Sequence, residues 1–269
     1  GIYYYVTKPW NAEELRVIID RALEAYQLRN DKRTLIDNLK SSNSELDTFL
    51  YRSSHDLKRP ITTMLGLAQV AKMSLKDSQA LELFSKVEET SLSMNKMLQK
   101  LYMVNDINLD EDHIADADVY EITKEILRTF DPIITRHKVT VRIDIAADAS
   151  HGWLNQQLFR NAIFNLIENA LIFRAKESPA ISIHAAKEVI DEDDWLSVAI
   201  EDNGHGIASQ YLPRIFDMYF VASEQTEGNG LGLYVVKRSV DKLGGTVSVN
   251  SVLNKGTLIG FKIPMKKNE

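Results

Sequence analysis

The chain has 269 residues, 44% hydrophobic and 26% charged, which is enough for two or three domains. Its formal charge of -6 argues against a general nucleic-acid or anionic-membrane binder, since both favour a basic surface. The sequence contains no cysteine, which excludes disulfides, thiolate metal sites and thiol catalysis and is typical of a cytoplasmic protein. No apolar run approaches the roughly 18 residues that span a bilayer, so we expect no direct membrane insertion.

The chain starts at Gly1 rather than Met, which indicates a fragment of a longer protein. The first ten residues are predicted to form a short strand that ends at Lys8-Pro9. A helix follows from the N-cap candidate Asn11. From about Leu28 the apolar residues repeat in sevens, which predicts a coiled-coil stalk.

The helical pattern continues to about Met73, is interrupted near residues 74–79 and resumes over about 80–105. Forty helical residues span roughly 60 Å, too long for a monomer to cover their apolar face. We therefore expect an antiparallel helical hairpin that dimerises into a four-helix bundle, with a kink at Pro60. The acidic stretch 106–118 contains six carboxylates and is predicted to be a linker.

Beyond this stretch, helical and strand patterns alternate, which predicts a two-layer α/β sandwich. The expected helices cover residues 119–136, 156–173 and 231–243, and the expected strands cover 139–145, 180–186, 195–201, 246–252 and 257–264. Nine of the twelve glycines lie at or after position 204, which indicates that the backbone there approaches something closely.

The first chemical candidate is His55, which Asp56 follows directly. It lacks the partners of a hydrolase triad and the second His of a zinc pair. Two interpretations remain from the residues alone: a solvated helix histidine, or a nucleophile whose imidazolium the carboxylate stabilises. The string from Phe49 to Pro60 closely resembles the phosphoacceptor box of sensor histidine kinases.

Asn165 and Asn169 are spaced i and i+4, so their amides share one helical face. Such a pair is either two surface amides or a source of an oxygen ligand for Mg²⁺. The string from Asn161 to Ala170 resembles the asparagine box of the histidine-kinase ATP-binding fold. That resemblance implies that Asn165 and Asn169 bind ATP and that Asn169 ligates Mg²⁺.

Two glycine strings follow, at residues 202–207 and 228–233. Asp202 at a strand end can accept a hydrogen bond from an adenine amino group, although Asp-Asn-Gly is also a common hairpin turn. The second string leads into a helix whose N-terminus could hold phosphate, and it fits neither a Rossmann nor a Walker loop. Both strings resemble glycine boxes of the same kinase fold, which implies ATP-binding roles for several residues. These are Asp202, Gly204, Gly206, Gly228, Gly230, Leu231 and Gly232.

Two further strings complete the resemblance: residues 215–220 are similar to a phenylalanine box, and Lys255-Gly256-Thr257 to the last turn of an adenine site, which adds Thr257. All six boxes occur in family order over about residues 33–266. The resemblance implies a dimeric sensor histidine kinase that uses ATP and Mg²⁺. It would phosphorylate His55, with Asp56 as base or orienting carboxylate, and pass the phosphoryl group to an Asp of a response-regulator receiver domain.

The chain is expected to divide into four segments. Residues 1–28 would be the end of a receiver domain leading into the stalk, because Tyr5 to Pro9 resemble its last strand. Residues 29–108 would be the dimerisation and phosphoacceptor domain, 109–118 a linker, and 119–269 the catalytic ATP-binding domain of the histidine-kinase, gyrase and Hsp90 type.

Three positions depart from the family pattern. Ile172 and Val221 stand where relatives commonly carry cations near the ATP phosphates, and Arg174, Lys176 or Lys237 are candidate substitutes. Arg59 stands where bifunctional members carry Thr or Asn, which puts phosphatase activity in doubt. An alternative function is therefore a non-catalytic dimeric scaffold that binds nucleotide and a receiver domain.

A third interpretation is a stand-alone ATPase. ATP-hydrolysing relatives of the fold carry a Glu at the position of Asn165 as general base, and an amide cannot perform that role. Phosphoryl transfer to His55 is therefore preferred over sustained hydrolysis.

Overall fold

The computed structural model describes residues 12–109, 113–222 and 229–265, and the strand expected at residues 1–10 lies outside them. The chain comprises two compact units, residues 1–53 and 54–269, and helix α1 (Ala12–Ser74) runs through both. In the first unit α1 leaves Leu28 and Leu35 exposed, so two apolar residues of the predicted heptads are available to a second helix. None of the helices in the described ranges combines the length and apolar composition that crossing a bilayer requires.

The second unit begins with a helical hairpin. Helix α1 ends at Ser74 and α2 covers Ser78–Leu109, so the predicted interruption is confirmed. Asp77 accepts a hydrogen bond from the backbone N–H of Ala80 (2.7 Å), which satisfies one of the free N–H groups at the start of α2. Ile61 and Ala68 of α1 and Leu98 of α2 are buried, and α1 continues through Pro60.

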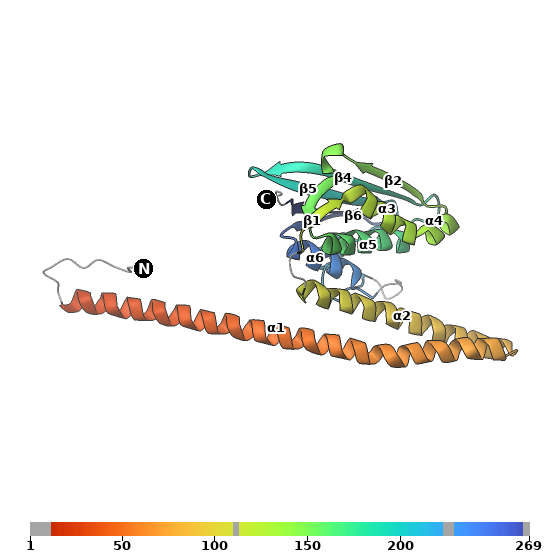
Figure 1. The fold of residues 1–269 in the computed structure, drawn as a ribbon, viewed down its shortest axis with the longest axis horizontal. Helices are drawn as coiled ribbons and strands as arrows, with labels where there is room; N and C mark the ends of the chain where they lie inside the picture. Colours follow the sequence, from red (N-terminus) through yellow and green to blue (C-terminus); the bar gives the residue numbers. More distant parts are fainter. Residues whose placement is uncertain (1–11, 110–112, 223–228, 266–269) are drawn as a thin grey trace. The chain divides into compact units, whose positions relative to one another are not determined.

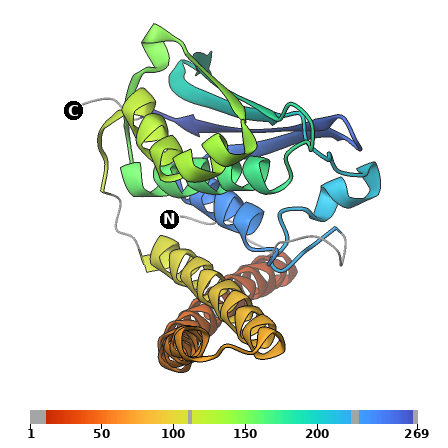
Figure 2. The ribbon, with the colours of Figure 1, turned by 90° about the vertical axis from the view of Figure 1, so that its right-hand side faces the viewer.

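An α/β domain follows, and its five-stranded sheet has the order β2-β4-β5-β7-β6. The β2–β4 pair is parallel and the other three pairs are antiparallel. The strands are β2 (Thr140–Ile145), β4 (Ala180–Ile190), β5 (Asp193–Asp202), β6 (Thr246–Val252) and β7 (Gly256–Pro264). Helices α3 (Val119–Thr129), α5 (Gln156–Ile172) and α6 (Gly232–Lys242) lie on one face of this sheet (Figures 1 and 2). The predicted two-layer sandwich is confirmed.

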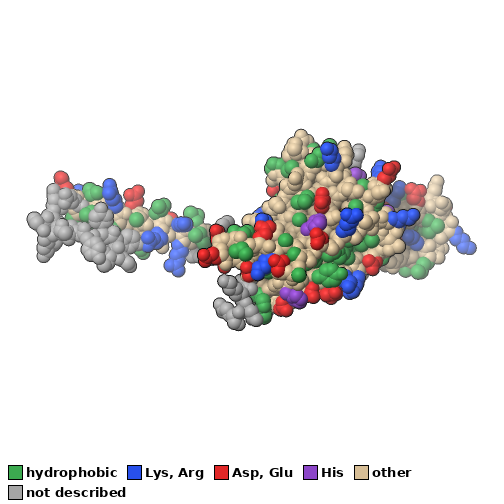
Figure 3. Space-filling view, turned by 90° about the horizontal axis from the view of Figure 1, so that it is seen from above, with side chains coloured by type: hydrophobic (Ala, Val, Ile, Leu, Met, Phe, Trp, Pro, Cys, Tyr) green, Lys and Arg blue, Asp and Glu red, His purple; other side chains and the backbone are tan. Residues whose placement is uncertain are grey.

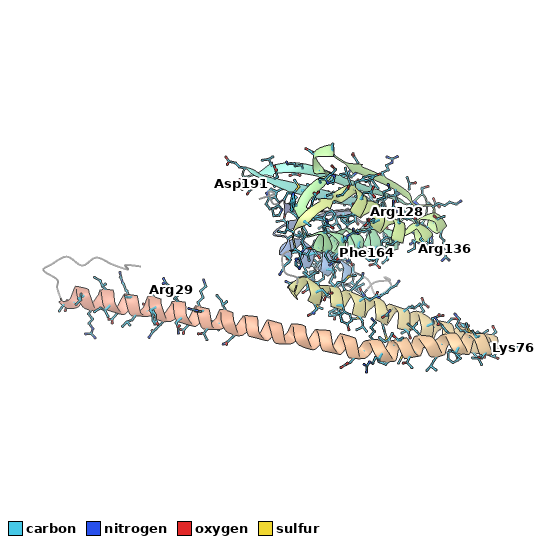
Figure 4. The ribbon with its side chains drawn as sticks, viewed as in Figure 1. Arg29, Lys76, Arg128, Arg136, Phe164 and Asp191 are labelled. Atoms are coloured by element: carbon cyan, nitrogen blue, oxygen red, sulfur yellow. The ribbon has the colours of Figure 1, made fainter. Side chains whose placement is uncertain are left out.

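The core of the domain lies between these helices and the sheet. Phe159 of α5 meets Phe261 of β7 edge to face, with ring centroids 6.0 Å apart, and both side chains are almost completely buried. Phe164 of α5 (labelled in Figure 4) packs against Phe130, with centroids 5.0 Å apart. On the face viewed from above in Figure 3, Lys, Arg, Asp and Glu side chains are interspersed with hydrophobic ones over the domain.

The structure differs from the sequence prediction between residues 109 and 154. The last four residues of the expected linker form β1 (Ala115–Asp118), which pairs with the unpredicted strand β3 (His151–Leu154). The burial of Ala117 fixes β1 against the core, and Asp118 then caps α3 by accepting a hydrogen bond from the Glu121 N–H (2.9 Å).

The helix expected at residues 119–136 is two helices, α3 and α4 (Asp131–His137). Phe130, with φ of -100°, separates them, and Pro132 occupies the first turn of α4, where its missing N–H costs nothing. A 3-10 turn, η1 (Ala147–Ala149), precedes β3, and a second, η2 (Ser209–Arg214), follows the loop after β5.

Candidate functional site

A cavity of about 730 Å³ opens between α5, the end of β5, the loop around η2 and the start of α6. Its volume is in the range typical of small-ligand sites, and its lining is mostly apolar with a few polar groups. The polar and glycine residues that line it are Lys100, Asn169, Asp202, His205, Gly206, Tyr211, Asn229, Gly230, Gly232 and Thr257.

Asp202 is the last residue of β5 and lies opposite Thr257 of β7. Burial raises the pKa of its carboxyl group from 3.8 to about 6. Hydrogen bonds from the Gly204 and Thr257 backbones act in the opposite direction on this pKa, and the Gly204 bond is 2.7 Å long. The carboxylate is therefore a fixed hydrogen-bond acceptor in a mostly apolar cavity.

The loop after Asp202 passes close to the end of α5. The His205 N–H donates to the Phe173 carbonyl oxygen (2.9 Å), and a Cβ on Gly204 would lie only 2.1 Å from that oxygen. Gly204 is thus needed for the close approach of loop and helix. Gly204 itself does not line the cavity, whereas Gly206 does.

Helix α5 places the two predicted site asparagines, Asn165 and Asn169, at different depths. Its N-cap Asn155 accepts from Gln157 and Leu158, which fixes where the helix starts. Asn165 is fully buried, donates to the Asn161 carbonyl (2.8 Å) and has a side-chain oxygen with no partner among the described residues. Asn169 lines the cavity, and Asn165 does not.

The start of α6 closes the cavity opposite α5. A Cβ on Gly232 would lie 3.1 Å from the Asn169 side-chain oxygen, so the start of α6 and this amide are in close contact. Leu231, at the N-cap position, is buried and gives no side-chain cap, which leaves N–H groups of the first turn available to an anion. Gly230 lines the cavity with φ of +66°, and Gly228 lies outside the described residues.

The amide oxygen of Asn169, in the cavity lining, is a suitable ligand for Mg²⁺. The described residues contain no group of three His, Cys, Asp or Glu that could hold a metal ion. Mg²⁺ keeps most of its waters and takes few protein ligands, so a single amide oxygen is compatible with it.

Two family models match the chain. Residues 45–108 match the His Kinase A (phospho-acceptor) domain, and residues 154–267 match the histidine kinase-, DNA gyrase B-, and HSP90-like ATPase. By these two domains the chain belongs to the histidine kinases. Its ATPase domain holds the cavity, and its phosphoacceptor domain contains His55.

Characterised sensor kinases resemble this histidine kinase along almost its whole length. The autoinducer 2 sensor kinase/phosphatase LuxQ of Vibrio vulnificus is 28% identical over 97% of this chain and 32% of LuxQ. Cyanobacterial phytochrome A of Nostoc sp. is 27% identical over 97% of this chain and 34% of its own length. The chain spans about a third of the length of these two relatives.

Solved histidine kinases share the fold. Full-length ShkA, crystallised with AMPPNP, aligns with a TM-score of 0.66 over 81% of this chain and 46% of ShkA, at 19% identity. The histidine kinase AdeS of Acinetobacter baumannii aligns with a TM-score of 0.56 over 79% of this chain and 98% of AdeS, also at 19% identity.

The structure brings six of the residues predicted for ATP binding to one cavity: Asn169, Asp202, Gly206, Gly230, Gly232 and Thr257. Gly204, Leu231 and Asn165 are not among its lining residues, and Leu231 and Asn165 are buried. His55 and Asp56 are consecutive residues of α1, and the side chain of His55 lies outside the described side chains.

Two positions where relatives commonly carry a cation are uncharged in this chain, and the structure shows where they lie. Ile172 and Val221 both line the cavity. The three candidate substitutes are not among the lining residues: Arg174 donates to the Leu171 carbonyl (2.7 Å) and Lys237 pairs with Asp241 (2.5 Å).

The cation found in the lining is Lys100 of α2, which the sequence reasoning missed. The helical pattern around Met97, Leu98 and Leu101 predicts a helix there, but it does not tell which α2 side chain reaches the ATPase domain.

Proposed function

We propose that this chain is the catalytic portion of an ATP-dependent protein-histidine kinase. The observation that carries the proposal is the cavity in which Asp202, Asn169 and the α6 N-terminus converge, in the same chain as a phosphoacceptor helix. An adenine acceptor, a magnesium ligand and a phosphate-binding helix end are the three groups that Mg-ATP needs. The AMPPNP complex of ShkA supports the choice of nucleotide.

In this proposal Asp202 accepts a hydrogen bond from the adenine amino group, and Thr257 and the glycine loop shape the base pocket. Asn169 would hold Mg²⁺, which supplies positive charge to the phosphate oxygens. The N–H groups at Gly230 to Gly232 would bind phosphate, with Gly228 and Leu231 in the same segment and Asn165 positioning α5.

The imidazole of His55 would attack the γ-phosphorus, so a new N–P bond forms while the bond to the bridging oxygen of ADP breaks. The ring N–H proton would pass to Asp56, the neighbouring carboxylate, and then to water. The phosphoryl group would next move from His55 to an Asp of a response-regulator receiver domain.

The helical hairpin, within residues 29–108, would form the homodimer. Its second-unit portion exposes apolar side chains with helical spacing on both helices, at Leu57, Met64 and Leu67 of α1 and at Leu83, Val87 and Met94 of α2. A second hairpin packed on these residues completes a four-helix bundle. The ATP-binding domain, within residues 119–269, would then bind the ATP that phosphorylates His55 on the bundle.

Incubation of the whole chain with γ-labelled ATP and Mg²⁺ tests the proposal. We expect acid-labile, base-stable label on the protein, and we expect His55→Gln to abolish it. Nucleotide binding with no label would support the scaffold alternative. Steady phosphate release that persists in His55→Gln would show a stand-alone ATPase and contradict the role given to Asn165.

A further inference from the structure

Lys100 of α2 reaches the cavity of the ATPase domain. Its Nζ lies 2.6 Å from a carboxylate oxygen of Glu168, and only 12% of its side chain is exposed. Glu168 directly precedes Asn169 on α5. The same Nζ lies 3.4 Å from the position that a Cβ on Gly232 would occupy, so it stands beside both Asn169 and the start of α6.

Lys100 is the one Lys or Arg that lines the cavity in the described ranges of the chain. The segment 223–228, which the structure leaves undescribed, contains no Lys or Arg in its sequence. Ile172 and Val221 give the lining no charge. Without Lys100, the carboxylate of Glu168 would repel phosphate groups bound near the start of α6. Only Mg²⁺ and helix N–H groups would then offset that repulsion.

We propose that Lys100 binds the phosphate groups of the nucleotide, so that the phosphoacceptor hairpin supplies the cation that the ATPase domain lacks. The inference rests on the proposed nucleotide site. An ammonium group has three donors, so Lys100 can keep Glu168 as one partner and give the others to phosphate oxygens. Glu168 then orients the lysine.

An apolar contact holds α2 against the ATPase domain, which keeps Lys100 at the cavity. Val104 and Ile107 of α2 are buried in one cluster with Leu158 of α5 and Val235 of α6. This cluster lies one to two helical turns beyond Lys100 on α2, and it fixes the helix against the ATPase domain.

Binding therefore couples the two domains. If Lys100 contributes to phosphate affinity only while α2 packs against the ATPase domain, then by linkage bound nucleotide must stabilise that packing by the same free energy. Adenosine, which lacks phosphates, would not have this effect.

The test compares two ligands on the full chain: AMPPNP with Mg²⁺, and adenosine. Lys100→Met keeps the length of the side chain and removes its charge. Loss of a charge-assisted hydrogen bond predicts that AMPPNP affinity falls about tenfold or more, while adenosine affinity stays within about twofold. Lys96→Met, one turn earlier on α2 at an exposed position, is the matched control and should change neither affinity.

Glu168→Gln separates phosphate binding from a purely structural ion pair. The side-chain oxygen of Gln can still accept a hydrogen bond from Lys100 and so keeps its orientation, while the negative charge is removed. If Lys100 binds phosphate, AMPPNP affinity therefore stays unchanged or rises. A fall equal to that of Lys100→Met would overturn the inference, as would Lys100→Met weakening both ligands equally or neither. Wild-type chain that binds neither ligand would overturn the proposed nucleotide site itself, and this inference with it.

Discussion

At the scale of single residues, the carboxyl group of Asp202 gives the site a pH dependence. Its pKa of about 6 means that the free protein carries an increasing fraction of neutral Asp202 as pH falls below 6. A neutral carboxyl group is a weaker acceptor for the adenine amino group. Binding that needs the ionised form therefore loses affinity on the acid side and is constant well above pH 6.

We expect the dissociation constant for adenosine to rise about tenfold between pH 7.5 and pH 5. Adenosine is the suitable ligand because it has no phosphates that titrate in this range. Calorimetric titrations of the wild-type chain and of Asp202→Asn measure the effect, and the variant should bind more weakly but with little dependence on pH. A similar acid-side loss in Asp202→Asn would assign the titration to a group other than Asp202.

The residues of the site differ in how far the sequence could predict them. Asp202 and Asn169 were predicted because their strings are characteristic and because a strand end and a helix face fix where they point. The raised pKa of Asp202 could not be predicted, since it arises from burial by residues distant in sequence. Lys100 could not be predicted either, because its role depends on how α2 packs against α5 and α6.

At the scale of elements, helices and strands with a long apolar period were predicted correctly, and short ones were missed. Strands β1 and β3 have four residues each, too few for an alternating pattern to be visible. The break at Phe130 had a local signal in Pro132, which favours the first turn of a new helix. The acidic character of residues 106–118 concealed both the end of α2 and the whole of β1.

The cap that β1 supplies to α3 makes an energetic prediction. Asp118→Ala removes the acceptor for the Glu121 N–H, which costs about 1 kcal/mol of unfolding free energy. Asp116→Ala is the matched control, because Asp116 lies on the same strand and, like Asp118, within 4 Å of the His151 ring (3.7 and 3.8 Å) but caps no helix. Urea unfolding should show a loss for Asp118→Ala that is at least twice that of the control. Equal losses would mean that the contacts with His151, and not the cap, stabilise this corner.

At the scale of the whole molecule, the second unit joins a phosphoacceptor hairpin and an ATPase domain through two kinds of contact. The apolar cluster around Val104 and Val235 is non-directional, whereas the Lys100–Glu168 pair adds a charge to the nucleotide cavity. In the proposed role of Lys100, the position of α2 is part of the nucleotide site. The proposal therefore predicts that a movement of the hairpin changes nucleotide affinity.

The exposed apolar face of the hairpin predicts how the molecule assembles. Leu67 is 63% exposed in the single chain, while Ile61 and Ala68 of the same helix are already buried within the hairpin. Leu67→Asp would place a charge in the expected bundle core of both protomers, where burial of an unpaired carboxylate is costly. We expect the dimer dissociation constant to rise at least tenfold, measured by sedimentation equilibrium on the full chain.

Gln69→Asp introduces the same charge at an exposed position two residues away, on the opposite side of α1, and should leave dimerisation unchanged. Circular dichroism would show whether both variants keep the helical content of the wild type. If Leu67→Asp remains as tightly dimeric as Gln69→Asp, the dimer forms through other residues, and the stalk heptads that contain Leu28 and Leu35 become the next surface to test. Phosphorylation of His55 should persist in a monomeric Leu67→Asp chain only if ATP and His55 belong to the same protomer, so the variant also separates transfer within a chain from transfer between chains.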